Sequence, residues 1–155
     1  MIIAPHEIDE NHLLAIEQLF GKANKLRYSQ ANEQNVITAD VLIIDNIGML
    51  SSIYQYASIA YIGGGFGKGI HNILEAATFG KPVIFGPNFK KFSEAKELIK
   101  LGGAFSISSK ENLISILETI NNLDTLSRIS TISKNYVCAH SGACSIILST
   151  IELSN

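Results

Sequence analysis

The sequence predicts an α/β protein with a Rossmann-like, doubly wound parallel sheet that carries helices on both faces. Short apolar runs rich in β-branched residues alternate along the chain with amphipathic stretches of helical length. The connections between them are short, and a glycine-rich loop joins one strand to the next helix. Such alternation indicates parallel strands covered by helices, and right-handed crossovers arrange them as a doubly wound sheet.

The first third of the chain contains three expected strands and one expected helix. Residues 41–44 are predicted to be a buried strand, because they are apolar without alternation and rich in β-branched residues. Weaker strands are expected at 2–4 and 26–28. A helix is expected over residues 9–20, with Asp9 as its N-cap.

The rest of the chain continues the same alternation. Glycines after two of the expected helices favour their ends, since glycine accepts the left-handed conformation found at helix C-termini. The expected strands are residues 59–62, 82–85 and 104–107. The expected helices are residues 47–57, 71–79 and 93–101, followed by two or three helices within 110–153 with a break near Ser141–Gly142.

Composition limits the possible classes of function. The 155 residues suit one domain, and 46% of them are hydrophobic. A net charge of -2 without a long basic run argues against nucleic-acid binding. No apolar run approaches the roughly 20 residues of a membrane span, so we expect a soluble chain. Two cysteines, Cys138 and Cys144, are too few for a disulfide scaffold, which favours a reducing compartment.

The most informative segment is the glycine loop, residues 63–69, in which five of seven residues are glycine. It follows an expected buried strand and precedes an expected helix, at the sheet edge where such folds bind ligands. Glycine permits close backbone approach to an anion, and a helix N-terminus favours phosphate or carboxylate. Lys68 adds a cation. The alternative is a glycine-rich turn without a ligand.

Neither of two common phosphate-binding motifs fits this loop. No register supplies the G-x-G-x-x-G spacing of dinucleotide-binding proteins. A P-loop requires Ser or Thr directly after its lysine, but Gly69 follows Lys68. The loop therefore predicts an anion site of another kind.

Three polar residues follow the loop at the start of the expected helix. His71 and Glu75 are four apart and are expected to share a helix face. Glu75 is suited to accept hydrogen bonds from ribose hydroxyls, or else it complements the helix dipole. Asn72 is a candidate helix cap, and His71 either contacts an anion or is structural.

Three other loops also follow expected strands, so four loops are predicted to converge on one rim. The segment 45–50 either reads a nucleobase edge with its backbone or is an ordinary turn capped by Asn46. Residues 5–7 and 86–88 complete the rim. The neighbouring Lys90 and Lys91 are expected to be a solvated face.

The order of these motifs resembles a known family, the bacterial 3-deoxy-D-manno-octulosonic acid (Kdo) transferases, in their C-terminal domain. The resemblance spans Ile2 to Ile107 and, more loosely, the final helices. The residues that carry it are Ala4-Pro5-His6-Glu7, Asp45-Asn46-Ile47-Gly48-Met49-Leu50, Tyr54, Ala57, Gly63-Gly64, His71-Asn72, Leu74-Glu75-Ala76-Ala77, Gly80-Lys81-Pro82-Val83, Phe85-Gly86-Pro87 and Phe92.

The resemblance implies the C-terminal half of a two-domain GT-B glycosyltransferase, which binds CMP-Kdo and transfers Kdo to a lipid A precursor in lipopolysaccharide core biosynthesis. It implies no metal and no cofactor. It places the catalytic base and the acceptor site in an N-terminal domain, at the cytoplasmic face of the bacterial inner membrane. The implied donor-binding residues are His6, then Ile47, Gly48 and Met49 near the cytosine, then Gly64, Gly65, His71, Asn72 and Glu75 near the phosphate and ribose.

The sequence departs from the family at several positions. Gly65 stands where many relatives have Ser, Met49 where Glu is common, Ile70 where Gly precedes the His, and Lys91 where Asn precedes the Phe. Residues 1–155 are expected to form a single nucleotide-sugar-binding domain that lacks the acceptor domain and its own first strand, and to be inactive alone.

Two other functions remain open. The first is a UDP-sugar transferase or epimerase of the same architecture. Many such transferases carry a second Glu eight positions before the ribose Glu, and here that position is Gly67, which argues against this alternative. The second is a Rossmann-like binding domain without catalysis, since the chain shows no convincing acid/base pair.

Overall fold

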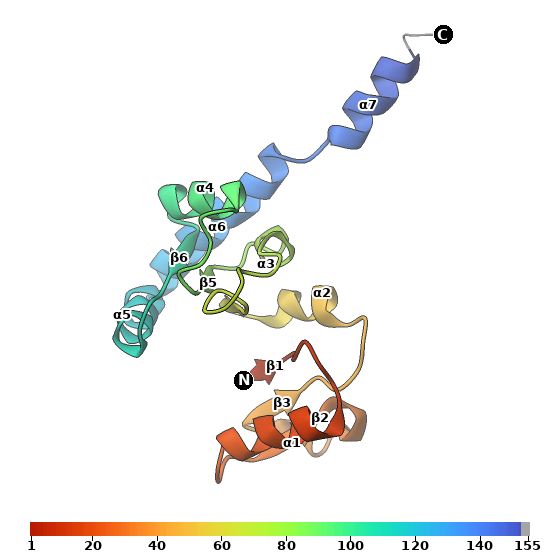
Figure 1. Cartoon of the computed structure of the whole chain (residues 1–155), viewed down its shortest axis with the longest axis vertical. Helices are drawn as coiled ribbons and strands as arrows, with labels where there is room; N and C mark the ends of the chain where they lie inside the picture. The colour runs from red at the N-terminus through yellow and green to blue at the C-terminus, as the bar shows by residue number, and fades with distance from the viewer. Residues whose placement is uncertain (153–155) are drawn as a thin grey trace. The chain divides into compact units, whose positions relative to one another are not determined.

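The computed structural model describes residues 1–152, so Leu153, the last residue of the expected helical region, lies outside the described residues. The chain folds into two compact units, Met1–Ile53 and Tyr54–Asn155. Each unit is built around its own parallel three-stranded sheet (Figure 1). The predicted α/β class and the parallel pairing of the strands are thus confirmed, with the strands divided between two sheets.

The first unit packs one helix against its sheet. Its strands are β1 (Ile2–Ile3), β2 (Lys25–Arg27) and β3 (Val41–Ile43), paired in the order β1-β3-β2. The helix α1 (Glu10–Leu19) begins as predicted, because the Asp9 side chain accepts a hydrogen bond from the His12 amide. Leu13 of α1 packs with Val41 and Ile43 in the core.

Two short 3-10 turns, Tyr28–Gln30 and Val36–Thr38, were not predicted from the sequence, and Tyr28 lies in the first of them rather than in strand β2.

An ion pair also ties this unit together. The guanidinium of Arg27 contacts Glu10 and Glu17 of α1, each at 2.7 Å. Its hydrogen bonds to these carboxylates raise the pKa of Arg27 and hold it cationic.

The second unit has helices on both faces of its sheet. The buried residues of strand β5 alternate between faces: Val83 and Phe85 belong to one core cluster and Ile84 to another. The strands are β4 (Ala60–Ile62), β5 (Val83–Phe85) and β6 (Ala104–Ser106), in the order β4-β5-β6. The helices are α3 (Leu74–Thr78), α4 (Ser93–Leu101), α5 (Lys110–Ile120), α6 (Leu123–Ala139) and α7 (Ala143–Glu152).

Two predicted helices begin later than expected. The helix expected from 71 begins at Leu74, because the His71 amide donates to Gly63 O at 3.1 Å and closes a loop instead. The helix expected over 47–57 is reduced to α2 (Leu50–Ile53) and a 3-10 turn, Tyr54–Tyr56. Gly48 explains the later start, since its φ of 94° is incompatible with a right-handed helix.

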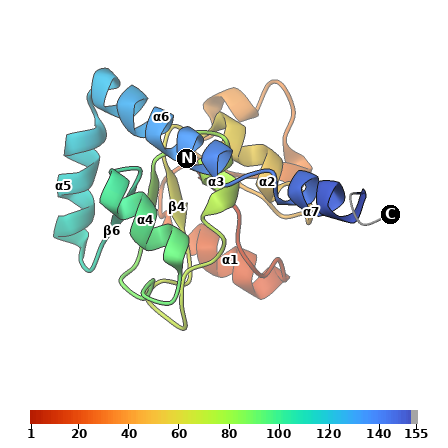
Figure 2. The same cartoon turned by 90° about the horizontal axis from the view of Figure 1, so that it is seen from above.

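The end of the described chain is helical, as predicted. The break near Ser141–Gly142 is confirmed, since α6 ends at Ala139 and α7 begins at Ala143. Helix α7 extends beyond the end of α6 in both views (Figures 1 and 2). Among the helices of the described residues, none has the length and apolar character needed to cross a membrane. That residues 1–155 form a single domain stays a prediction.

Candidate functional site

The glycine loop lies where the sequence placed it, directly after strand β4. The following strand, β5, ends at Phe85 and leads into the segment 86–92. Because β4 and β5 are parallel neighbours, both segments leave the same edge of the second sheet, where α/β folds bind ligands. Buried Ile62, Ile70 and Ile73 anchor the glycine loop at its two ends.

The loop is folded tightly on its own backbone. The carbonyl oxygen of Gly64 accepts hydrogen bonds from the amides of Gly67 at 2.8 Å and Gly69 at 3.3 Å. Gly64 has a φ of 85°, and a Cβ there would lie 2.3 Å from Gly69 O. Position 64 therefore requires glycine both for its conformation and for its space.

Asn88 fastens the segment after β5 to the glycine loop. Its backbone amide donates to Gly65 O at 2.9 Å, and its side-chain amide donates to Gly67 O at 2.8 Å. The sequence interpretation treated Asn88 only as part of a turn. The position of Asn88 directly after Gly86-Pro87 was the only local indication of its role. Its hydrogen-bond partner, Gly67, lies 21 residues earlier, and no pattern in the sequence pairs the two.

The three polar residues after the loop are brought together differently from the prediction. His71 and Glu75 do not share a helix face, because His71 precedes the helix. The His71 ring instead lies over the glycines: a Cβ on Gly64 would be 3.2 Å from His71 Nε2. Asn72 accepts a hydrogen bond from the Leu74 amide at 3.0 Å and donates to Glu75 Oε1 at 2.9 Å.

Glu75 has a further neighbour in Tyr54. The pKa of the Tyr54 hydroxyl is raised, chiefly by burial and then by the negative charge of Glu75. Glu75 itself is half-buried at the start of α3. The carboxylate thus accepts a hydrogen bond from Asn72 and is near enough to Tyr54 for its charge to oppose ionisation of the phenol.

The remaining predicted site residues lie in the first unit, in the loops after β1 and β3. His6 is exposed in the loop after β1. After β3, Ile47 is 88% exposed and the Asn46 side chain donates to the sulfur of Met49 at 3.0 Å. A Cβ on Gly48 would meet nothing within 4 Å. The backbone between Asn46 and Met49 is thus open on its outer side.

Asp45, at the start of the same loop, is held by Ser29. Ser29 donates to the Asp45 carboxylate through its amide at 2.9 Å and also through its hydroxyl. Partial burial opposes ionisation, but the hydrogen bonds from Ser29, together with the Asp45 amide and the charge of Arg27, outweigh it, so the pKa of Asp45 is lowered. Two predicted loops therefore share the edge of the first sheet and two share the edge of the second, while the single rim of four loops stays a prediction.

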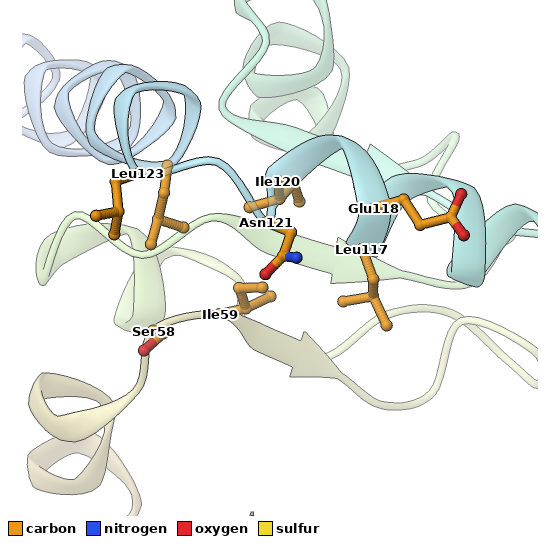
Figure 3. Close-up of a pocket in the computed structure, with 8 residues that line it drawn as sticks. Ser58, Ile59, Leu117, Glu118, Ile120, Asn121 and Leu123 are labelled. Carbon is orange, nitrogen blue, oxygen red and sulfur yellow. The ribbon is translucent and has the colours of Figure 1, made fainter.

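The described part of the second unit contains a smaller and a larger cavity that bear on the site. The smaller, about 260 Å³, lies beside the glycine loop and is lined by Gly67, Lys68, Pro87, Asn88, Lys90, Lys91 and Phe92. The larger, about 460 Å³, is lined mainly by apolar side chains of Ile59, Leu117, Ile120, Leu123 and Leu126 (Figure 3). Ser58 and Ile59 precede β4 whereas the glycine loop follows it, so the larger cavity lies at the opposite edge of the sheet.

Residues able to bind metal do not gather in the described part of the chain. No group of three or more His, Cys, Asp and Glu side chains within residues 1–152 is placed to hold an ion. Cys138 and Cys144 are free and exposed. The chemistry available at the glycine loop is thus that of backbone amides, lysine ammonium groups, one histidine and one carboxylate.

Fold and site together define a Rossmann-like α/β protein with a glycine loop at the carboxyl edge of its sheet. No family model matches the chain. The chain is similar, however, to curated 3-deoxy-D-manno-octulosonic acid transferases. Identity is 42% over 88 residues with that of Rickettsia bellii, covering 56% of this chain and 21% of the relative. The transferase of Rickettsia typhi is 33% identical over 105 residues, which cover 67% of this chain and 23% of the relative.

A bifunctional glycosyltransferase/methyltransferase of Fusobacterium nucleatum is 33% identical over 128 residues, covering 79% of this chain and 20% of the relative. The chain therefore spans about a fifth of the length of these curated relatives. The crystal structure of the C-terminal CMP-Kdo binding domain of WaaA from Acinetobacter baumannii superimposes with a TM-score of 0.75 at 19% identity, over 88% of this chain and 72% of that one. The resemblance to the C-terminal domain of Kdo transferases is thus confirmed.

Proposed function

We propose that this chain is the CMP-Kdo-binding half of a glycosyltransferase that transfers Kdo to a lipid A precursor. The observation that carries the proposal is the glycine loop after β4, followed by the hydrogen-bonded pair Asn72 and Glu75. Similarity to curated Kdo transferases supports the choice of donor.

The loop and the pair after it are suited to the phosphate and ribose of a nucleotide. Gly64 is exposed at the start of the loop, and we assign its backbone, with that of the neighbouring Gly65, to the phosphate. The His71 ring lies beside them and can donate to a phosphate oxygen. Asn72 fixes the carboxylate of Glu75 through one oxygen, which leaves the second oxygen of Glu75 to accept from ribose hydroxyls.

The loop after β3 is assigned to the base. The exposed backbone of Ile47, Gly48 and Met49 can present amide and carbonyl groups to the edge of cytosine, which differs from uracil in its exocyclic amine. His6, in the neighbouring loop after β1, is assigned to the donor as well. These assignments extend the family resemblance residue by residue.

Catalysis requires more than this chain. Departure of CMP develops negative charge on its phosphate, and preorganised amides and cations stabilise such charge without a metal. We assign the base that activates the acceptor hydroxyl, and the binding of the lipid A precursor, to an N-terminal domain. The complete enzyme is then placed at the cytoplasmic face of the bacterial inner membrane.

The test is a titration of the ¹⁵N-labelled chain with CMP and, in parallel, with UDP. The expected result is CMP-selective shifts at Gly48, Gly64, Gly65 and Glu75, because only cytosine matches the base contacts. Preference for UDP would instead support a UDP-sugar enzyme of the same architecture. Absence of shifts with either nucleotide would contradict a donor site in this chain.

A further inference from the structure

The smaller cavity of the second unit is separate from the residues assigned to the nucleotide. Two of its lining residues, Gly67 and Lys68, come from the second half of the glycine loop. The others come from the segment after β5: Pro87, Asn88, Lys90, Lys91 and Phe92. Both segments leave the carboxyl edge of the sheet, so this lysine cavity adjoins the candidate donor site.

Positive charge is concentrated at the lysine cavity. Lys68, Lys90 and Lys91 line it, and no acidic residue does. Among residues 1–152, no ion pair within 4.0 Å is found for Lys68, Lys90 or Lys91, whereas Arg27 pairs with Glu10 and Glu17. The chain carries a net charge of -2, and three of its 12 Lys and Arg residues gather here.

Hydrogen bonds and packing fix the walls of the lysine cavity. Asn88 holds the two segments together through hydrogen bonds to Gly65 O and Gly67 O. The Phe92 ring packs against the loop, since a Cβ on Gly69 would lie 3.2 Å from Phe92 Cε2. A cavity with rigid walls and unpaired cations at its rim is suited to an anionic group of defined size.

The volume limits what that group can be. About 260 Å³ corresponds to roughly nine water molecules at ~30 Å³ each. This is slightly below the ~300–1,000 Å³ of pockets that enclose a whole small-molecule ligand. The space therefore suits one charged group together with part of a sugar, and it is too small to enclose a complete nucleotide sugar.

We propose that the lysine cavity binds an oxyanion, either the carboxylate of a sugar acid or a phosphate, as a second anionic contact beside the one assigned to Gly64 and Gly65. The inference rests on the proposed function for its choice of ligands. It goes beyond it in giving roles to Lys68, Lys90 and Lys91. The alternative, that Lys90 and Lys91 form only a solvated face, stays a prediction that the experiments below distinguish from this one.

The first experiment separates the two sources of the oxyanion. The ¹⁵N-labelled chain is titrated with free Kdo, which has a carboxylate and no phosphate, with inorganic phosphate, and with CMP. Shifts at Lys68, Asn88, Lys90 and Lys91 with Kdo alone would assign the cavity to a sugar carboxylate. The same shifts with phosphate or CMP would assign it to a phosphate. Absence of shifts at these residues with all three would overturn the proposal.

The second experiment tests the lysines with matched charge changes. Lys68→Ala, Lys90→Ala and Lys91→Ala are compared with Lys96→Ala and Lys100→Ala, which remove the same charge from α4 outside the cavity. Each cavity variant should lower the affinity for the ligand that shifted these residues in the first experiment. The expected loss is roughly two- to fivefold, the effect of an exposed ion pair. The triple variant should weaken it further. Equal losses in the α4 variants would show a general charge effect and overturn the proposal.

The outcomes also separate this inference from the proposed function. CMP-selective shifts at Gly64 and Glu75 with no response at the lysines would leave the proposed function standing and remove the cavity from it. Shifts at the lysines without a preference for CMP over UDP would support the lysine cavity as an anion site and contradict the proposed CMP-Kdo function. Unchanged thermal unfolding of each variant, followed by circular dichroism, would show that the fold is intact.

Discussion

Gly65 and Gly86 lie with their backbones in direct contact: a Cβ on Gly65 would be 2.6 Å from the Gly86 amide nitrogen, and a Cβ on Gly86 would be 2.5 Å from the Gly65 carbonyl carbon. Two loops that leave neighbouring strands are thereby packed without any side chain between them. This contact gives glycine at both positions a packing role of its own.

The first prediction follows from that contact. Gly65→Ala should lower the free energy of unfolding by about 1–3 kcal/mol, the usual cost of overpacking a filled space. Gly65→Ser should do the same, because it places a Cβ in the same filled space. The control is Gly67→Ala, since a Cβ there would meet only Gly64 O, at 3.6 Å. Urea unfolding of the three variants measures the difference, and equal stability of Gly65→Ala and Gly67→Ala would contradict the prediction.

The second prediction concerns the pair Asn72 and Glu75. Glu75→Gln keeps the shape of the side chain but removes its charge, so CMP binding should weaken about tenfold or more, the worth of a hydrogen bond to a charged group. The same change should lower the raised pKa of Tyr54, because the charge of Glu75 contributes to it after burial.

Calorimetric titration with CMP and ultraviolet titration of the tyrosines measure these two effects. Glu94→Gln, on α4, is the matched control and should leave both unchanged. A fall in the pKa of Tyr54 without loss of CMP affinity would show that Glu75 is structural and remove it from the donor site.

The parts of the structure that the sequence predicted depend on neighbours in the chain. Helix α4 has the predicted bounds because Gly102 ends it in the left-handed conformation, and α1 begins at its predicted cap, Asp9. The late start of α3 depends instead on a hydrogen bond from His71 to Gly63 across the loop.

The same distinction applies to the candidate site. The composition of the glycine loop marked it as a ligand loop, and the pairing of Asn72 with Glu75 is local. The fastening of Gly67 by Asn88 spans 21 residues, and the gathering of Lys68 with Lys90 and Lys91 depends on which strands are neighbours. Contacts of this kind follow from strand order, which no local pattern in the sequence specifies.

The third prediction concerns acid stability of the first unit. The pKa of Asp45 is lowered in the folded state, where the hydrogen bonds from Ser29 act with the Asp45 amide and the charge of Arg27 against the effect of burial. A lowered folded-state pKa contributes stability that is present above the unfolded-state pKa and is lost as the pH falls through the folded-state pKa. Ser29→Ala should therefore lower the free energy of unfolding at pH 7. In this variant the free energy of unfolding should also fall less steeply below pH ~4 than in the parent chain.

Urea unfolding at several pH values from neutral to acidic measures this dependence. Ser51→Ala serves as a comparison, because Ser51 is exposed in α2 and is not among the groups that change the pKa of Asp45. A parallel loss of stability at every pH in Ser29→Ala would mean that the hydrogen bonds do not act through the charge of Asp45.

The fourth prediction concerns the attachment of α6 to α4. The hydroxyl of Tyr136 donates to Glu97 Oε2 at 2.8 Å, and the Tyr136 ring lies 4.2 Å from that of His140, centroid to centroid. Burial, with contributions from Glu97, raises the pKa of Tyr136 from 10.0 to about 12. Because the raised pKa favours the neutral phenol, its contribution to stability is complete below pH 10 and is lost as the pH rises through about 12.

Tyr136→Phe should therefore lower the free energy of unfolding at pH 8 by about 1–2 kcal/mol, the worth of one partly buried hydrogen bond to a carboxylate. Because phenylalanine cannot ionise, the variant should also lack the part of the alkaline decline between pH 10 and 12 that belongs to Tyr136. Tyr56→Phe is the control, since Tyr56 is 75% exposed. Urea unfolding across this range, together with the loss of one tyrosine titrating near pH 12, measures the effect. An alkaline decline unchanged from that of the parent chain would show that Tyr136 does not hold α6 to α4 through its neutral hydroxyl.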